Sequence, residues 1–110
     1  MKESDSIRLQ HILDAIVDIE SFTKDISLTK FKEHRLIHNA TVRCFEIIGE
    51  AVAALSDELR MEDENFPWQD WKDFRNILIH QYFGVDYEMV YNTVLKDMPD
   101  LKKEVNRLLG

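Results

Sequence analysis

The sequence predicts an all-α protein, a bundle of four to five helices. Apolar residues recur at intervals of three and four, which is the spacing of one helix face. Only three of the 110 residues are Gly and two are Pro, too few turn formers for a protein with many strands. A chain of this length buries roughly 65% of its unfolded surface on folding, enough for one modest core. We therefore expect residues 1–110 to form a single domain.

The first expected helix spans Ser6–Lys24, with Asp5 or Ser6 as its N-cap, because either side chain can accept a hydrogen bond from an amide of the first turn. A short helical turn over Ser27–Glu33, capped by Ser27, is expected to follow. The apolar residues that place the first helix are Leu9, Ile12, Leu13, Ile16, Ile19 and Phe22.

The second long helix is expected over Arg35–Leu59, and its apolar face is unusually wide. So wide a face indicates burial on two sides and predicts that the chain dimerises through this helix. Gly49 costs about 1 kcal/mol in a helix interior relative to Ala. The close approach of another backbone would compensate for it, or the glycine is simply tolerated. The face contains Ile37, Ala40, Cys44, Ile47, Ile48, Ala51 and Leu55.

Proline and glycine mark the remaining elements. A third helix is expected over Pro67–Tyr82, since proline suits a first helical turn and Gly84 suits a C-terminal cap. Asp86 is the expected N-cap of a fourth helix. A short fifth helix is expected after Pro99, ending at Gly110.

Charge and composition narrow the function. The net charge is −7 and the pI about 5.0, which argues against broad binding to nucleic acid because phosphate contacts need clustered Lys and Arg. Any nucleic-acid site must therefore be local. The single cysteine, Cys44, cannot form an internal disulfide, and no signal peptide or membrane span is evident. We expect a cytoplasmic protein with no membrane association.

Polar residues interrupt the apolar pattern of the third helix. At about 100° per residue, Asn76 and His80 lie within about 40° of each other, with Arg75 at the adjoining edge and Tyr82 near the helix end. Spacing alone is equally typical of a helix end whose Arg and His cap carbonyls or pair with carboxylates, and of a tyrosine in a core or an interface.

The segment from Arg75 to Tyr82, RNILIHQY, matches the R-x4-H-x-Y motif of HepT-like toxins of the HEPN superfamily. Asn76 matches the polar residue usual after the arginine. The resemblance extends to Arg43–Ala51, RCFEIIGEA, and to Phe83–Tyr91, FGVDYEMVY, and covers nearly the whole chain in length and helix order. A motif with such flanks in an all-α chain of this size is more specific than a bare arginine–histidine pair.

The resemblance implies a metal-independent endoribonuclease toxin of a type VII-like toxin–antitoxin pair, acting as a homodimer on an RNA such as tRNA or mRNA. It implies no metal or other cofactor. Arg75 would hold phosphate oxygens, Asn76 would orient the phosphate or the histidine, and His80 would transfer protons. The partner would be a minimal nucleotidyltransferase antitoxin, which attaches AMP to Tyr82 and so blocks the cleft formed by two motifs.

A second interpretation stays open, in which the helical dimer is a non-catalytic binding module that docks a nucleotidyltransferase or a nucleotide.

Other pairs of polar residues are weaker candidates for a functional site. His34 and His38 are four residues apart and could share a metal, although no third ligand is evident. Glu46 and Glu50 could form an acid pair, but a solvated helix face near Arg43 explains them better. Alternatively, Glu50 could pair with Arg75 and aim its guanidinium. Finally, His11 is expected to face solvent.

Overall fold

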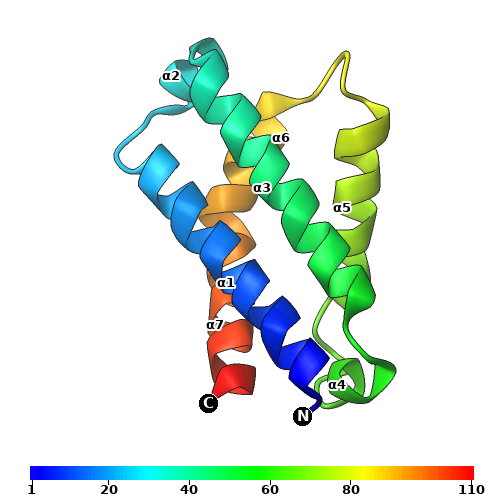
Figure 1. Cartoon of the computed structure of the whole chain (residues 1–110). Coiled ribbons are helices and arrows are strands. Elements are labelled where there is room, and N and C mark those ends of the chain that lie inside the picture. The colour runs from blue at the N-terminus through cyan, green and yellow to red at the C-terminus, as the bar shows by residue number, and fades with distance from the viewer.

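The computed structural model describes residues 1–110 and contains seven helices and no strand (Figure 1), which confirms the all-α prediction. None of the seven combines the length and the low charge that a membrane span requires. In chain order the helices are α1 (Glu3–Thr23), α2 (Leu28–Glu33), α3 (Arg35–Ala54), α4 (Asp57–Met61), α5 (Trp68–His80), α6 (Tyr87–Lys96) and α7 (Met98–Leu109).

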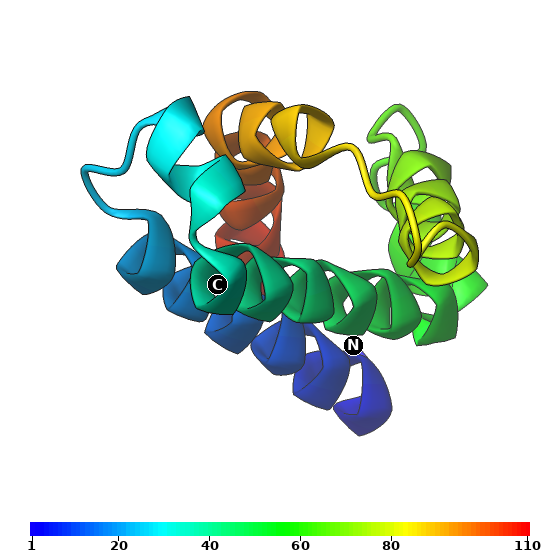
Figure 2. The same cartoon turned by 90° about the horizontal axis from the view of Figure 1, so that it is seen from above.

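The long helices α1 and α3 lie side by side and form one layer of the molecule (Figure 2). Helix α5 packs against α3 on one side, while α7 packs against α1 and continues from α6 on the other. Helix α2 connects α1 to α3 and packs against α6. Viewed from above, α5 stands apart from α6 and α7, so its main support is α3.

One hydrophobic core joins these helices, and α3 lies at its centre. The wide apolar face of α3 packs against α1 and α5 of the same chain. The width of that face therefore requires no second chain, contrary to the argument from sequence. The largest fully buried side chains are Leu9, Ile12, Ile16, Ile19, Phe31, Phe45, Ile48, Leu78 and Leu101.

The predicted helix Arg35–Leu59 is wrong at its C-terminal end. Helix α3 ends at Ala54, and Leu55 adopts an extended backbone with ψ of 145°. Ser56 then caps the short helix α4, because its hydroxyl accepts a hydrogen bond from Leu59 N at 3.2 Å. A serine that can cap a new helix competes with continuation of the old one.

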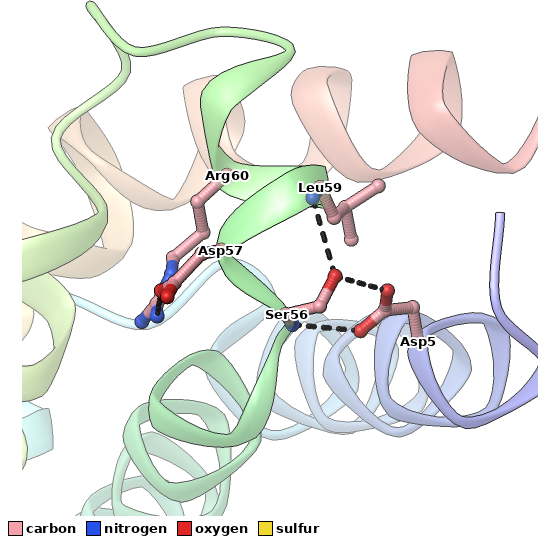
Figure 3. A network of polar contacts seen from close by, with 5 residues as sticks. All are labelled: Asp5, Ser56, Asp57, Leu59 and Arg60. Carbon is pink, nitrogen blue, oxygen red and sulfur yellow. Dashed lines mark hydrogen bonds and ion pairs between the residues drawn. The ribbon is translucent and has the colours of Figure 1, made fainter.

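The same serine is held by Asp5, and Figure 3 shows this network. The Asp5 carboxylate accepts hydrogen bonds from Ser56 N at 2.8 Å and Ser56 Oγ at 2.6 Å. Neither Asp5 nor Ser6 is the N-cap of α1, contrary to prediction, because the helix starts at Glu3 and Lys2 occupies the cap position. Asp5 instead joins the start of α1 to the junction of α3 and α4.

Asp5 is only 2% exposed, and its pKa reflects two opposing effects. Burial raises the pKa of this carboxyl, but the hydrogen bonds from Ser56, together with the positive charges of Lys2 and Arg8, more than offset burial and leave the pKa below its usual 3.8. The folded state therefore favours the carboxylate form.

The other expected boundaries hold in part. Ser27 caps α2 by accepting from Lys30 N, and Asp86 caps α6 by accepting from Met89 N at 3.1 Å, as predicted. The third helix is shorter than Pro67–Tyr82, and Gly84 does not cap it, since the C-cap is Gln81, whose amide bonds to a carbonyl of the last turn.

The last helix, α7, begins earlier than predicted. It starts at Met98, and Pro99 lies in its first turn. A proline is tolerated there because the amide hydrogen that it lacks would have no helical partner. The sequence places the helix after Pro99, whereas Pro99 belongs to its first turn.

Replacing Asp5 with Asn should destabilise the protein at pH 7 by about 1–3 kcal/mol. One of the two oxygens that accept hydrogen bonds from Ser56 becomes an NH2 group, which cannot accept. A lowered folded-state pKa contributes stability that is fully present above pH 3.8 and is lost as the pH falls through the folded-state value. Urea unfolding at pH 7 and at acidic pH should show the difference between parent and variant narrowing with acid.

The matched control is Asp18→Asn, which changes an exposed carboxylate on the same helix. This variant should unfold within about 0.5 kcal/mol of the parent. Equal effects of the two substitutions would show that the contact between Asp5 and Ser56 contributes nothing specific.

Candidate functional site

The four residues singled out from the sequence lie at the C-terminal end of α5. Arg75, Asn76 and His80 belong to the helix itself, and Tyr82 follows in the turn over residues 81–84. Arg75 is half-buried, while Asn76 and His80 are exposed, and Tyr82 is 81% exposed. The structure thus gathers all four at one exposed end of a helix.

Arg75 and Asn76 are joined by two hydrogen bonds. The guanidinium donates from Nε at 3.3 Å and from Nη2 at 2.9 Å to the same oxygen, Asn76 Oδ1. No carboxylate forms an ion pair with Arg75, so the proposed pairing with Glu50 is absent. The remaining N–H groups of the guanidinium have no partner within the chain and can take an anion.

Gly49 on α3 lies directly against Arg75 and so determines how close Arg75 comes to α3. A Cβ atom at residue 49 would lie 2.3 Å from Arg75 Cβ and 2.9 Å from Trp71 O, both well inside contact distance. Only glycine allows α3 and α5 to come so close. Of the two alternatives for Gly49, the structure shows the close approach of another backbone, and the neighbour is a helix of the same chain.

Aromatic packing fixes the orientation of α5 on α3. The ring of Phe45 stacks on Trp71 with 6.0 Å between centroids and meets Phe74 edge-on at 5.2 Å. Leu78, one turn further along, is 1% exposed. These contacts hold one face of α5 against the core and leave the face with Asn76 and His80 in solvent.

The surface next to His80 is unusually apolar. Phe83 is 82% exposed, and its ring lies perpendicular to that of Tyr82, with centroids 5.7 Å apart. Ile77 and Ile79 are 39% and 41% exposed. Sequence reasoning did not select Phe83. The available signal was its position directly after the motif, in a turn that the periodic pattern of α5 does not reach.

The two histidines considered as metal ligands have other roles. His34 caps α3, because its Nδ1 accepts from Ile37 N at 3.3 Å. His38 is buried, with Nδ1 3.1 Å from Phe31 O and its ring stacked on Tyr87 at 3.9 Å. No group of three potential metal ligands comes together in the fold, so the two rings support packing and capping.

The two glutamates of α3 differ in exposure. Glu46 forms an ion pair with Arg43 at 3.3 Å and its side chain is 20% exposed, whereas Glu50 is exposed, so the solvated face expected from the sequence holds for Glu50 and only in part for Glu46. His11 is also exposed, as expected.

None of the five hollows on the surface is lined by a motif residue. One of them is a groove of about 330 Å³ between α5 and the α6–α7 junction, lined by Trp71 and Phe74 and by three carboxylates, Asp70, Asp97 and Asp100. The carboxylates have no ion-pair partner and would repel RNA phosphates. The motif therefore lies on an open surface, outside any pocket of a single chain.

The end of α5 thus combines three groups. A guanidinium with free donors can bind an anion, an exposed imidazole can accept or donate a proton, and an exposed phenol follows two residues later.

Comparison with known proteins gives the family. The family described as "Ribonuclease HepT-like" matches residues 12–108. The chain is 42% identical over 97 residues to a Methanocaldococcus jannaschii protein named "Putative RNase", covering 88% of this chain and 89% of that one. It is 36% identical to the "Probable ribonuclease HepT" of Thermococcus cleftensis, covering 98% of each. No solved structure matches. The chain belongs to the HepT-like ribonuclease family.

A further relative from M. jannaschii is 38% identical over 109 residues, which cover 99% of this chain but only 49% of that protein. Its name joins two activities, "Gamma-glutamylcyclotransferase and putative RNase". A region of this length is thus found both as most of a protein and as about half of a larger one.

Replacing Gly49 with Ala should destabilise the protein by about 1–3 kcal/mol, the usual cost of overpacking a core. The added Cβ must displace Arg75 Cβ and the carbonyl of Trp71. Gly84→Ala is the matched control, because nothing lies within 4 Å of a Cβ there. Thermal unfolding of both variants tests the contact, and a Gly49→Ala protein as stable as Gly84→Ala would contradict it.

Proposed function

We propose that this protein is a metal-independent endoribonuclease toxin. The observation that carries the proposal is the end of α5, where Arg75 keeps unpaired donors and His80, five residues later on the same helix, is exposed. Family membership supports an activity on RNA. The alternative is a non-catalytic module that docks a nucleotidyltransferase or a nucleotide, and the acidic groove beside α5 favours it.

The side chains can supply the chemistry without a metal. Cleavage through the 2′-hydroxyl requires a base to take its proton, a cation to stabilise the charged phosphorane, and an acid to protonate the leaving 5′-oxygen. Arg75 holds the phosphate oxygens bidentately, and Asn76 fixes the guanidinium through Oδ1. His80 acts on a proton, and two such imidazoles supply both the base and the acid.

The need for two imidazoles makes a homodimer part of the proposal. A single chain has one motif, on an open surface with no enclosing hollow. A second copy would bring a second Arg75 and His80 and create a cleft between them. The exposed apolar side chains of Ile77 and Ile79 offer area for this contact. We take residues 1–110 as one domain of each protomer.

Replacing Arg75 or His80 with Ala should abolish RNA cleavage and toxicity, because one removes the phosphate ligand and the other a proton carrier. His80 is exposed, and Arg75→Ala keeps the Cβ atom that lies against Gly49, so unfolding should shift by less than about 1 kcal/mol. Chelator should leave cleavage of the parent unchanged. Cleavage of a labelled RNA, followed with and without EDTA, gives the measurement.

A parent protein that stops cleaving in EDTA would contradict the metal-free mechanism, as would a His80→Ala protein that cleaves like the parent. A parent that binds a nucleotidyltransferase but cleaves no RNA would favour the binding module. Sedimentation at micromolar concentration should show twice the 13.0 kDa of the chain, and a pure monomer would exclude the composite site.

We further propose that a minimal nucleotidyltransferase antitoxin silences the site by attaching AMP to Tyr82. The hydroxyl is reachable, since the residue is 81% exposed, and the turn leaves room for a partner's active site. The added phosphate carries negative charge next to the phosphate-binding arginine, and the nucleoside fills space. Both effects oppose the entry of RNA without any change of fold.

Tyr82→Phe should fold, keep RNA cleavage and escape modification, because the ring remains and only the acceptor oxygen is lost. Co-expression with the nucleotidyltransferase and ATP, followed by intact-mass measurement, should show added AMP on the parent alone. Equal modification of both proteins would place the acceptor elsewhere. Full activity of the modified parent would reject silencing at this residue.

A further inference from the structure

We infer that Phe83, supported by Tyr82, is a platform on which an unpaired base of the RNA stacks, so that the site takes single-stranded RNA. This inference rests on the proposed ribonuclease function and names the substrate class of that site. It concerns Phe83, a side chain outside the motif.

The exposure of Phe83 is exceptional in this chain. The protein has eleven aromatic residues, six Phe, two Trp and three Tyr. All except Tyr82 and Phe83 are buried or half-buried, whereas these two are 81% and 82% exposed. The two rings touch only at right angles, with centroids 5.7 Å apart, so a flat face remains free. No packing role within the chain accounts for this position.

The location of Phe83 favours RNA as the occupant. It follows His80 by three residues, in the turn that ends α5, and this end of the helix also carries Arg75. Because both residues belong to this end of the helix, a phosphate on the guanidinium and a base on Phe83 would be parts of one RNA strand. Aromatic side chains commonly hold such bases by stacking, at about 1–3 kcal/mol per base.

The negative charge of the protein makes base stacking the more important source of RNA affinity. With a net charge of −7 and three unpaired carboxylates in the groove between the first half of α5 and the α6–α7 junction, few phosphate contacts are available to hold RNA. Stacking on a π-face supplies affinity that needs no positive charge.

The same geometry selects single strands. In an RNA duplex each base is covered by its neighbours, and protein side chains reach only the groove edges and the backbone. Unpaired bases in loops and single strands can be splayed out and stacked on a phenyl ring. A platform at Phe83 therefore excludes continuous duplex from productive binding.

The test measures binding separately from cleavage. A short single-stranded RNA that is fully 2′-O-methylated lacks the attacking hydroxyl and stays intact, so fluorescence anisotropy gives its Kd. A hairpin of the same modified chemistry and a minimal loop provides the duplex comparison. The variants are Phe83→Ala, Phe83→Leu and Phe83→Trp, with Leu95→Ala, 58% exposed on α6, as the matched control.

Phe83→Ala and Phe83→Leu should weaken binding of the single strand by about 5-fold to 150-fold, the range that corresponds to one lost stack. Phe83→Trp should bind at least as well as the parent, and Leu95→Ala should match it. Binding of the hairpin should be weaker for the parent and insensitive to residue 83. Loss of binding in Phe83→Leu matters most, because leucine keeps the apolar bulk and removes the π-face.

The inference is overturned if Phe83→Leu binds the single strand like the parent, or if hairpin and single strand bind equally. It is also overturned if Phe83→Ala converts a parent dimer to monomer in sedimentation, because the ring then belongs to an interface between copies. Cleavage of unmodified RNA by the parent is measured in parallel. If the parent binds RNA through Phe83 but cleaves none, stacking is supported and the proposed ribonuclease function is rejected. If the parent cleaves RNA but binding does not depend on Phe83, the ribonuclease function is supported and stacking is rejected.

Discussion

The close approach of α3 and α5 at Gly49 is the constraint on which the rest of the site depends. Because residue 49 has no side chain, the backbone of Trp71 and the stem of Arg75 rest directly on α3. Phe45 then fills the space beside this contact with two stacked or edge-on aromatic contacts. The separation of α5 from α3 determines the position of the Arg75 guanidinium at the surface. A larger residue at position 49 would increase that separation and move the whole motif outward.

Much of the fold could be predicted because its signals are local. Helical spacing, the cap at Asp86 and the cap at Ser27 each depend on a few neighbouring residues, and the structure confirms them. The same local rules failed at Asp5, which sequence alone assigns to a helix cap. Its actual partner, Ser56, is 51 residues away, and no periodicity connects positions so distant. The break of α3 before Ser56 escaped prediction although the cap of α4 is a local contact, because Leu55 and Leu59 continue the helical spacing across it.

In the candidate site, too, some residues could be predicted from the sequence and others could not. Arg75, Asn76, His80 and Tyr82 could be selected because the resemblance to a known family covers that segment, and their grouping at one helix end follows from helical geometry. The partner of Gly49 could not be selected, since a glycine reveals that something approaches but not what. Phe83 had no periodic signal, because it lies beyond the last turn of α5 and its exposure depends on the absence of neighbouring elements.

Helix α5 has α3 as its main neighbour, and its backbone stands apart from those of α6 and α7 (Figure 2). A helix with one main neighbour can detach while the other helices keep their mutual contacts, as a partial opening below the free energy of global unfolding. Amide hydrogens of α5 would then exchange with solvent sooner than those of α1 and α3. On warming, the end of α5 would lose its order before the bundle melts, so the thermal limit of function would lie below the thermal limit of the fold.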